Sequence, residues 1–234
     1  MNDLITPPIK TLIQHILNAM ETGSAAGDYA NISIMADGPG NTRQITYGRS
    51  QTTETGNLRK LVLKYIANNG KYAQSFKRYV DGTGDDEIGI NRLVHNSEFI
   101  TLLKMAGTED PIMISSQDEF FDEEYWTPAY MFFKRENFLF PLSMLVIYDS
   151  YIQSGRILEF LRQKFSEKTP LVGGNEKQWI HEYIDVRHQW MRTHQRPAVR
   201  ASIYRTNDYK RLITQENWML DQLPIMANGV KINS

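Results

Sequence analysis

The sequence predicts a mainly α-helical protein, in the α+β class, with one small β-hairpin near its N-terminus. Apolar residues recur at three- and four-residue spacing in several segments, which is typical of helices that bury one face. Only residues 31–47 instead alternate apolar and polar side chains on either side of a glycine-rich turn. Residues 138–148 are almost entirely apolar and predict a helix buried on all sides.

The first predicted helix covers residues 9–21 and places a carboxylate at its end. Its apolar side chains follow one face, and Glu21 lies one turn beyond Leu17. We therefore expect Glu21 at the margin of the buried face. Taken alone, it can equally be a surface glutamate at a helix end.

A β-hairpin is predicted next, with strands at residues 31–35 and 43–47. Residues 37–41, with the sequence Asp-Gly-Pro-Gly-Asn, form the turn between them. Asp37 on this turn can bond its own backbone or stay ionised and activate water. A carboxyl group beside apolar packing and a second one on a polar turn are what acid–base hydrolysis of a glycosidic bond requires.

The rest of the chain predicts further helices around the buried one. An interruption is expected at residues 107–111 and a loop or hinge at residues 169–174, because both are rich in turn residues. After the last helix we expect an irregular tail. The expected helices are residues 58–66, 72–80, 97–105, 116–132, 138–148, 157–165, 176–193 and 208–220.

Asp149 directly follows the apolar stretch, and its carboxylate therefore needs a cationic partner. Arg187, near the middle of the predicted helix 176–193, is the expected partner, and Arg205 lies beyond it. A buried ion pair that only fixes the geometry of the fold is the alternative role for these residues.

Composition excludes several classes of function. The 234 residues suffice for one large domain or two lobes. A net charge of −1 gives no basis for nucleic-acid binding. Without cysteine there is no disulfide, thiolate metal site or cysteine nucleophile, and the five histidines lack metal-ligand spacing. The four tryptophans are expected mainly in the core.

The segment from Glu21 to Asn57 resembles the signature of glycoside hydrolase family 46, the chitosanases. The resemblance lies in a Glu, a Tyr eight residues before an Asp, a Gly and a Thr after it, a further Gly, and a Thr-Gly-Asp. Other counterparts lie at similar spacing along most of the chain. The matching residues are Glu21, Tyr29, Asp37, Gly38, Thr42, Gly48, Thr55, Gly56, Asn57, Tyr148, Asp149, Ile184, Asp185, Arg187, Arg205, Arg211 and residues 232–234.

The resemblance implies a single glycoside hydrolase domain with a two-lobed, lysozyme-like fold. The smaller lobe would cover roughly residues 22–75, and the larger helical lobe roughly residues 1–21 and 76–234. Family members hydrolyse β-1,4 bonds between glucosamine units in a cleft between the lobes, invert the anomeric centre and need no metal. Inversion requires carboxyl groups roughly 6.5–9.5 Å apart, which leaves room for a water molecule.

Residue roles carried over from the resemblance are specific. Glu21 would be the general acid, Asp37 the base that activates water, and Thr42 the residue that holds this water. Arg205 would steady Glu21, together with Asp149 and Arg187. The expected substrate-binding residues are Tyr29, Arg43, Thr46 and Asn57.

Three positions and the length of one strand depart from the family pattern. Thr22 and Pro39 differ from the usual residues, and the strand before Gly48 is one residue longer, so that Thr46 competes with Thr42 for the water. Asn57 replaces the Asp that contacts a substrate ammonium in the family, which removes a charge attraction. We expect Glu54, which lies nearby, to compensate in part.

The sequence therefore predicts an inverting endo-β-1,4-glycosidase that acts on chitosan. One alternative is a lysozyme-like hydrolase of peptidoglycan or another aminosugar polymer, and another is an inactive glycan-binding protein. The expected partner is the polysaccharide, with no cofactor, nucleic acid or membrane, and the chain is expected to be a monomer. It shows no signal peptide, so it is either intracellular or secreted after loss of a leader, and we expect the second.

Overall fold

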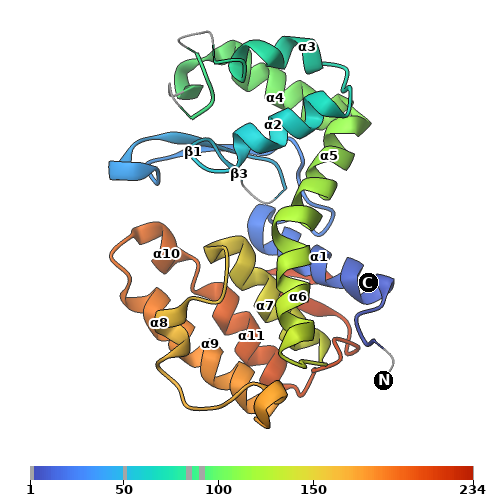
Figure 1. Cartoon of the computed structure of the whole chain (residues 1–234), viewed down its shortest axis with the longest axis vertical. Coiled ribbons are helices and arrows are strands. Elements are labelled where there is room, and N and C mark those ends of the chain that lie inside the picture. The colour runs from blue at the N-terminus through green and yellow to red at the C-terminus, as the bar shows by residue number, and fades with distance from the viewer. Residues whose placement is uncertain (1–2, 50–51, 83–85, 90–92, 234) are drawn as a thin grey trace. The chain divides into compact units, whose positions relative to one another are not determined.

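The computed structural model describes residues 3–49, 52–82, 86–89 and 93–233, so that Ser234 of the closing segment lies outside the described residues (Figure 1). The chain forms two compact units. Unit 1 contains Met1–Ala26 and Glu123–Ser234, and unit 2 contains Gly27–Asp122. Among the described residues, none of the helices is both long and apolar enough to span a bilayer.

Unit 1 is a group of helices arranged around α7, as Figure 1 shows. Residues 141–150 of α7 are all buried, which confirms the prediction of a helix buried on all sides. Pro141 occupies its first turn, where a missing N–H costs nothing. The helices are α1 (Pro7–Thr22), α6 (Thr127–Arg135), α7 (Pro141–Ser154), α8 (Glu159–Arg162), α9 (Glu176–Thr193), α10 (Pro197–Ala201) and α11 (Tyr204–Thr214).

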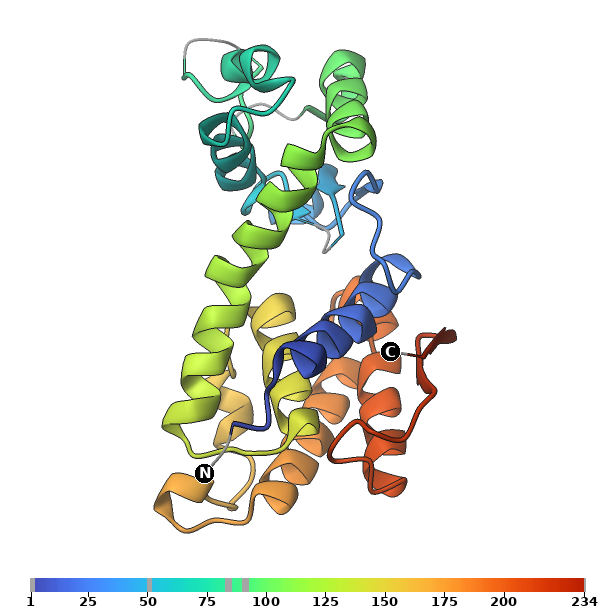
Figure 2. The same ribbon diagram turned by 90° about the vertical axis from the view of Figure 1, so that its right-hand side faces the viewer.

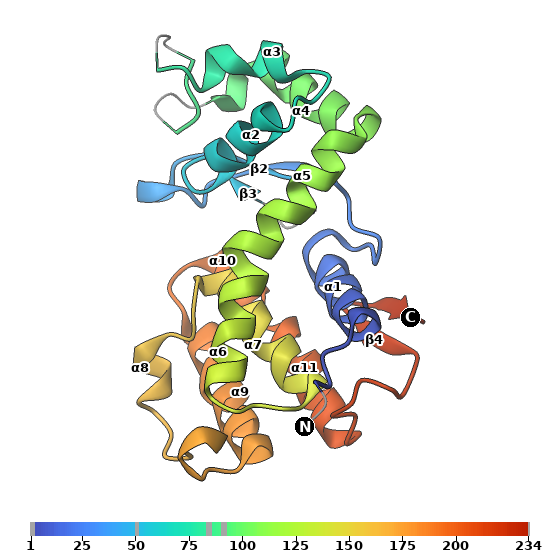
Figure 3. The same ribbon diagram turned by 45° about the vertical axis from the view of Figure 1, so that its right-hand side comes forward.

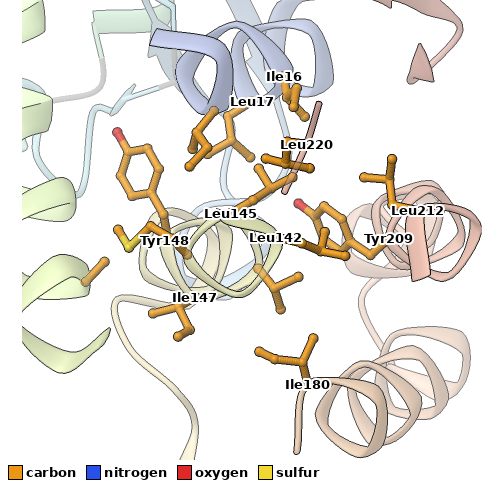
Figure 4. Close-up of a cluster of buried hydrophobic side chains, with 14 of the residues drawn as sticks. Ile16, Leu17, Leu142, Leu145, Ile147, Tyr148, Ile180, Tyr209, Leu212 and Leu220 are labelled. Carbon is orange, nitrogen blue, oxygen red and sulfur yellow. The ribbon is translucent and has the colours of Figure 1, made fainter. Parts of the chain in front are cut away.

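The core of unit 1 lies between α1, α7, α9 and α11. Figure 4 shows Leu17 of α1, Leu145 and Tyr148 of α7, and Tyr209 of α11 as parts of one apolar cluster. Three of the four tryptophans also belong to this core, which confirms the expected role for Trp126, Trp179 and Trp218. Burying large apolar side chains contributes roughly 1.5–3 kcal/mol each, and this packing fixes the end of α1.

The C-terminal tail is not irregular as expected. It forms a hairpin of β4 (Ile225–Ala227) and β5 (Val230–Ile232), which packs against α1 (Figure 2 and Figure 3). The preceding helix α11 ends at Thr214, earlier than predicted, because Glu216 adopts a left-handed backbone with φ of 52°. Apolar residues beyond it are buried without being helical.

Helix α8 is also shorter than the predicted 157–165. It ends at Arg162, whose guanidinium donates to the carbonyls of Phe165 at 3.0 Å and Glu167 at 2.8 Å. These bonds hold the following residues in a turn, so the apolar spacing there does not continue as a helix. Helix α9, in contrast, has the predicted bounds of residues 176–193.

Unit 2 contains the predicted hairpin as part of a three-stranded antiparallel sheet in the order β1-β2-β3. The strands are β1 (Ile32–Met35), β2 (Gln44–Tyr47) and β3 (Thr52–Thr53). Met35 pairs with Gln44 and Ile32 with Tyr47, so the register places the turn that carries Asp37 at one end of the sheet. The third strand was not predicted, because two residues are too short to show alternation.

Helices complete unit 2, and one of them corrects the expected break at residues 107–111. Helix α4 continues through Gly107 to Glu109, and α5 begins at Pro111 after Asp110. Gly107 serves close packing, since a Cβ there would lie 2.4 Å from the carbonyl oxygen of Tyr29. The helices are α2 (Leu58–Ala67), α3 (Ala73–Phe76), α4 (Ser97–Glu109) and α5 (Pro111–Phe121).

Unit 2 extends further along the chain than the expected 22–75. Helix α5 packs against both α2 and α4, so that residues up to Asp122 belong with the sheet. A π-helical turn, Asp122–Trp126, follows α5 and leads directly into α6. The helical pattern continues through this position, and the sequence therefore gives no local sign of where one unit ends.

Candidate active site

Glu21 lies in the last turn of α1, at the edge of the core of unit 1. The preceding residues Leu17 and Met20 are buried, and the Glu21 side chain is 13% exposed. Gly23 ends the helix with φ of 72°, and its N–H donates to the carbonyl of Ala19. The expected position of Glu21 at the margin of the buried face is confirmed.

An alternating chain of acids and arginines extends from Glu21 into the core. The Arg205 guanidinium contacts Glu21 Oε1 through Nη2 and Asp149 Oδ1 through Nη1. Arg187 Nη2 lies 2.7 Å from Asp149 Oδ2, and its Nη1 donates to Ser150 Oγ at 3.3 Å. The structure thus brings together all four residues that the sequence analysis expected to act together in this unit.

Burial and charge shift the pKa values of the two carboxyl groups of this network in opposite directions. Burial raises the pKa of Glu21 above its ordinary value, although Arg205 opposes this effect. Burial also disfavours the ionised form of Asp149, but the guanidiniums of Arg187 and Arg205 outweigh it and hold the pKa of Asp149 below its ordinary value. Asp149 therefore stays ionised and fixes Arg205, while Glu21 is the group more readily protonated.

Asp37 lies in unit 2, on the turn that joins β1 to β2. The turn contains a 3₁₀ segment, Pro39–Asn41, in which Gly40 and Asn41 have φ of 65° and 59°. The Gly38 N–H donates to the carbonyl of Thr42 at 3.0 Å, which closes the turn. Asp37 Oδ1 accepts a hydrogen bond of 3.0 Å from Gln44 Nε2.

Thr42 and Thr46 differ in their surroundings, which separates the two candidates for holding water. Thr46 is buried, and its Oγ1 donates to the Ser33 carbonyl at 3.1 Å within the sheet. Thr42 is half-buried on the turn, where its Oγ1 would lie 2.8 Å from a Cβ built on Gly38. The Thr42 hydroxyl thus borders the backbone next to Asp37, whereas that of Thr46 faces strand β1.

The other expected substrate-binding residues also lie in unit 2. Tyr29 donates from its hydroxyl to Asp118 Oδ1 at 2.9 Å, and burial raises the pKa of Tyr29 to about 12. Asn57 is half-buried and precedes the first turn of α2, and Arg43 is exposed beside the turn. Tyr29 is therefore fixed within unit 2, and Arg43 is the most solvent-exposed of the three.

Glu54 does not occupy the position expected of a group that compensates for Asn57. Its side chain is 2% exposed, and its two oxygens accept from the backbone N–H groups of Ile45 at 3.2 Å and Leu93 at 2.7 Å. A carboxylate that satisfies two buried backbone donors is part of the fold. The expectation that Glu54 contributes charge toward a ligand is therefore wrong.

Two residues that lie beside the candidate groups were not singled out from the sequence. Gln44 bonds Asp37 as described, and Tyr204 donates to the Met20 carbonyl at 2.5 Å beside Glu21. No motif in the sequence marks either residue. Gln44 could have been noticed only as a polar residue at the start of a strand that is otherwise buried.

The two candidate carboxyl groups therefore have different surroundings, each within its own unit. Glu21 in unit 1 is desolvated and has a raised pKa, whereas Asp37 in unit 2 lies on a polar turn. A protonated carboxyl can donate to a leaving oxygen, and an ionised one can accept a proton from water. No group of His, Cys, Asp or Glu suited to hold a metal ion occurs within the described part of the chain.

Several known proteins that resemble this chain in sequence or in fold are chitosanases. Chitosanase from Bacillus subtilis is 24% identical over 227 residues, which cover 86% of this chain and 78% of that protein. The crystal structure of a mutant chitosanase from Bacillus subtilis MY002 in complex with 6 GlcN matches with a TM-score of 0.81 and 19% identity, over 97% of this chain and 99% of that chain.

The chitosanase of Gynuella sunshinyii, in complex with chitotetraose, has a TM-score of 0.78 and 19% identity, over 97% of this chain and 98% of that one. These likenesses confirm the mainly helical, lysozyme-like fold class. The model of glycosyl hydrolase family 46 matches residues 15–225 and so includes both Glu21 and Asp37. This match covers most of the chain, and the chain therefore belongs to glycosyl hydrolase family 46 and is a glycoside hydrolase.

Proposed function

We propose that this protein is an inverting endo-β-1,4-glycosidase that hydrolyses chitosan, the polymer of glucosamine. Membership of the family and the substrates named for its relatives support this function. The observation that carries the assignment of the acid is the raised pKa of Glu21, bonded to an arginine that Asp149 holds from behind.

In the proposed reaction, protonated Glu21 gives its proton to the glycosidic oxygen as the bond to the anomeric carbon breaks. Asp37 accepts a proton from a water molecule, whose oxygen bonds the anomeric carbon from the opposite face of the sugar. The product has inverted configuration at this carbon. Glu21 then regains a proton from solvent and Asp37 releases one.

Supporting roles follow from the surroundings of the other residues. Thr42 holds the water beside Asp37, and we prefer it to Thr46, whose hydroxyl is already engaged with Ser33. Asp149 and Arg187 keep Arg205 directed at Glu21. Tyr29, Arg43 and Asn57 contact the sugar chain.

The test is cleavage of defined glucosamine oligosaccharides, with proton NMR of the newly formed anomer. We expect α-products from β-linked substrate, and a loss of about 10²–10⁴-fold in kcat for Glu21→Gln and for Asp37→Asn. Glu159→Gln, an exposed carboxylate at the start of α8, is the matched control and should retain activity. Normal cleavage by both site variants would refute the assignment, and retained configuration would refute inversion.

A second substrate is favoured by one observation, the amide at position 57. Asn57 offers hydrogen bonds but no charge to a substrate ammonium, and Glu54 is engaged with the backbone. Peptidoglycan or another aminosugar polymer is therefore the alternative. Assaying glucosamine polymer against cell-wall glycan at equal concentration distinguishes the two, and cleavage of only the cell-wall glycan would exclude chitosan.

A further inference from the structure

We propose that Gln44 is a positioning residue that holds the Asp37 carboxylate in the orientation needed to accept a proton from water. The inference rests on the proposed function, because it assumes that Asp37 is the base. Gln44 is 4% exposed at the start of β2, and its Nε2 donates to Asp37 Oδ1 at 3.0 Å. Both residues belong to unit 2.

The neighbours of Gln44 determine which end of its amide faces Asp37. Gln44 Oε1 accepts from the Thr55 backbone N–H at 3.2 Å and from Thr55 Oγ1 at 2.6 Å. A backbone N–H can only donate, so the oxygen of the amide must face Thr55. The NH₂ group is thereby directed at Asp37 Oδ1.

The backbone on which Gln44 sits is also held firmly. The next residue, Ile45, accepts a hydrogen bond of 2.8 Å at its carbonyl from the Glu54 N–H. In return, the Ile45 N–H donates to Glu54 Oε2 at 3.2 Å, and Glu54 Oε1 accepts from the Leu93 N–H. Glu54 therefore fixes strand β2 directly beside Gln44.

This support matters because Asp37 lies on a turn rich in glycine. Gly38 and Gly40 flank Pro39, and among the residues that the structure describes no other side chain hydrogen-bonds the Asp37 carboxylate. Engagement of Oδ1 by Gln44 leaves Oδ2 to face the reacting water. A misplacement of about 1 Å at a catalytic group can cost about 10²-fold in rate.

Gln44 also joins the two turns that carry candidate site residues. Thr55 begins the Thr55–Gly56–Asn57 turn, and Gln44 bonds Thr55 on one side and Asp37 on the other. The orientation of the base and the position of the turn with Asn57 are thus set by the same side chain.

The experiment compares Gln44→Met and Gln44→Glu with the unaltered protein on a glucosamine hexamer. Gln44→Met removes the donor and the acceptor at similar size, whereas Gln44→Glu keeps an acceptor for Thr55, removes the donor to Asp37 and places a second carboxylate beside it. We expect both to lower kcat by about 10–100-fold, because the base loses its orientation. Gln44→Glu, which keeps the bonds to Thr55, should change KM by less than about twofold, whereas Gln44→Met also frees the turn with Asn57 and should raise KM. Wild-type kcat in Gln44→Glu would overturn the proposal.

Asn217→Leu is the matched control for loss of a buried amide. Asn217 is 1% exposed in unit 1, and both ends of its amide bond Gln222 at 3.1 Å. The Asn217→Leu variant should lower the melting temperature as Gln44→Met does, but it should leave kcat unchanged. A fall in kcat in proportion to lost stability in both variants would show that Gln44 acts only through the fold.

A double-mutant cycle with Asp37→Ala separates this inference from the proposed function. If Gln44 acts through Asp37, Gln44→Met causes no further loss of rate once Asp37 is removed. Losses that multiply would overturn the positioning role. If Asp37→Ala itself keeps full activity, the proposed function fails; if it loses activity while Gln44→Met keeps it, only this inference fails.

Discussion

At the scale of single residues, Glu21 combines a buried setting with a strongly held cationic partner. The raised pKa of Glu21 reflects desolvation that Arg205 reduces without cancelling. Since Asp149 and Arg187 hold Arg205 in place, Arg205 cannot turn away to solvent. Glu21 is thus kept in one orientation in either protonation state, which suits a group that must repeatedly donate and regain a proton.

The pH dependence of activity follows from this arrangement. The acid must be protonated, so kcat/KM should fall as pH rises through the raised pKa of Glu21. We expect this alkaline limb to be absent in Glu21→Gln, whose residual rate should no longer depend on pH there. The measurement is kcat/KM on glucosamine hexamer from about pH 3 to about pH 9. An identical alkaline limb in Glu21→Gln would assign it to another group.

Asp149 illustrates how one buried carboxylate can determine stability. Asp149→Asn leaves the guanidiniums of Arg187 and Arg205 without their charge partner, and should cost about 3–5 kcal/mol of unfolding free energy. Because the pKa of Asp149 is lowered in the folded state, its contribution is present above its unfolded pKa of about 3.9 and is lost as pH falls below that value.

Urea unfolding at about pH 6 and about pH 3 measures this effect. Asp185→Asn is the control, since this aspartate is 47% exposed and pairs with Lys210 at the surface. Asp185→Asn should lower the unfolding free energy by at most about 1 kcal/mol. Equal losses of unfolding free energy in the two variants would mean that the buried ion pairs of Asp149 stabilise the fold no more than a surface ion pair does.

At the scale of elements, Gly107 shows why a helix can carry a residue that usually breaks one. Inside α4 it lets the backbone of Tyr29 and Ala30 approach, where a Cβ would lie 2.4 Å from the Tyr29 carbonyl oxygen. We expect Gly107→Ala to lower the unfolding free energy by about 1–3 kcal/mol, because overpacking against Tyr29 outweighs the higher helix propensity of alanine.

The control is Thr108→Ala at the next position of α4, which is exposed and should be neutral or slightly stabilising. Thermal unfolding of the two variants gives the comparison. A stabilised Gly107→Ala would show that the Tyr29 segment moves aside without cost. Altered KM without altered stability would instead point to a direct effect on sugar binding by Tyr29.

Long, regularly spaced helices and the hairpin of β1 and β2 were predictable from the sequence, whereas strands of two or three residues were not. The apolar spacing of α1 and the continuous apolar run of α7 identify both helices, because burial requires these patterns. The hairpin β4–β5 has only three residues in each strand and gives no such pattern. Gly107 was taken for a break because its close contact with Tyr29 comes from a distant part of the chain.

Only those residues of the candidate site that belong to the family motif were predictable from the sequence. The resemblance led to Glu21, Asp37 and Arg205, and the contact between Arg205 and Glu21 is present in the structure. Gln44 was not predicted as a site residue, because its proposed role depends on three-dimensional contacts with Asp37 and Thr55. For the same reason, the burial of Glu54 could not be foreseen from its position beside Thr55.

At the scale of the whole molecule, the division into units follows packing more than local sequence. Residues 27–122 form one uninterrupted stretch, whereas unit 1 combines the first 26 residues with the last part of the chain. The boundary near Asp122 lies within consecutive helical turns, so composition and turn residues cannot reveal it. Only the packing of α5 with α2 and α4 assigns it to unit 2.

This discontinuity has a consequence for how the protein is made. During synthesis α1 leaves the ribosome before unit 2, yet the partners of Glu21 are encoded far downstream, at Asp149 and Arg205. The stretch 27–122 has its internal contacts available before Asp149 and Arg205 are made, and can fold as a unit in the meantime. The surroundings of Glu21 are therefore completed only after unit 2 and the start of α11 have been made.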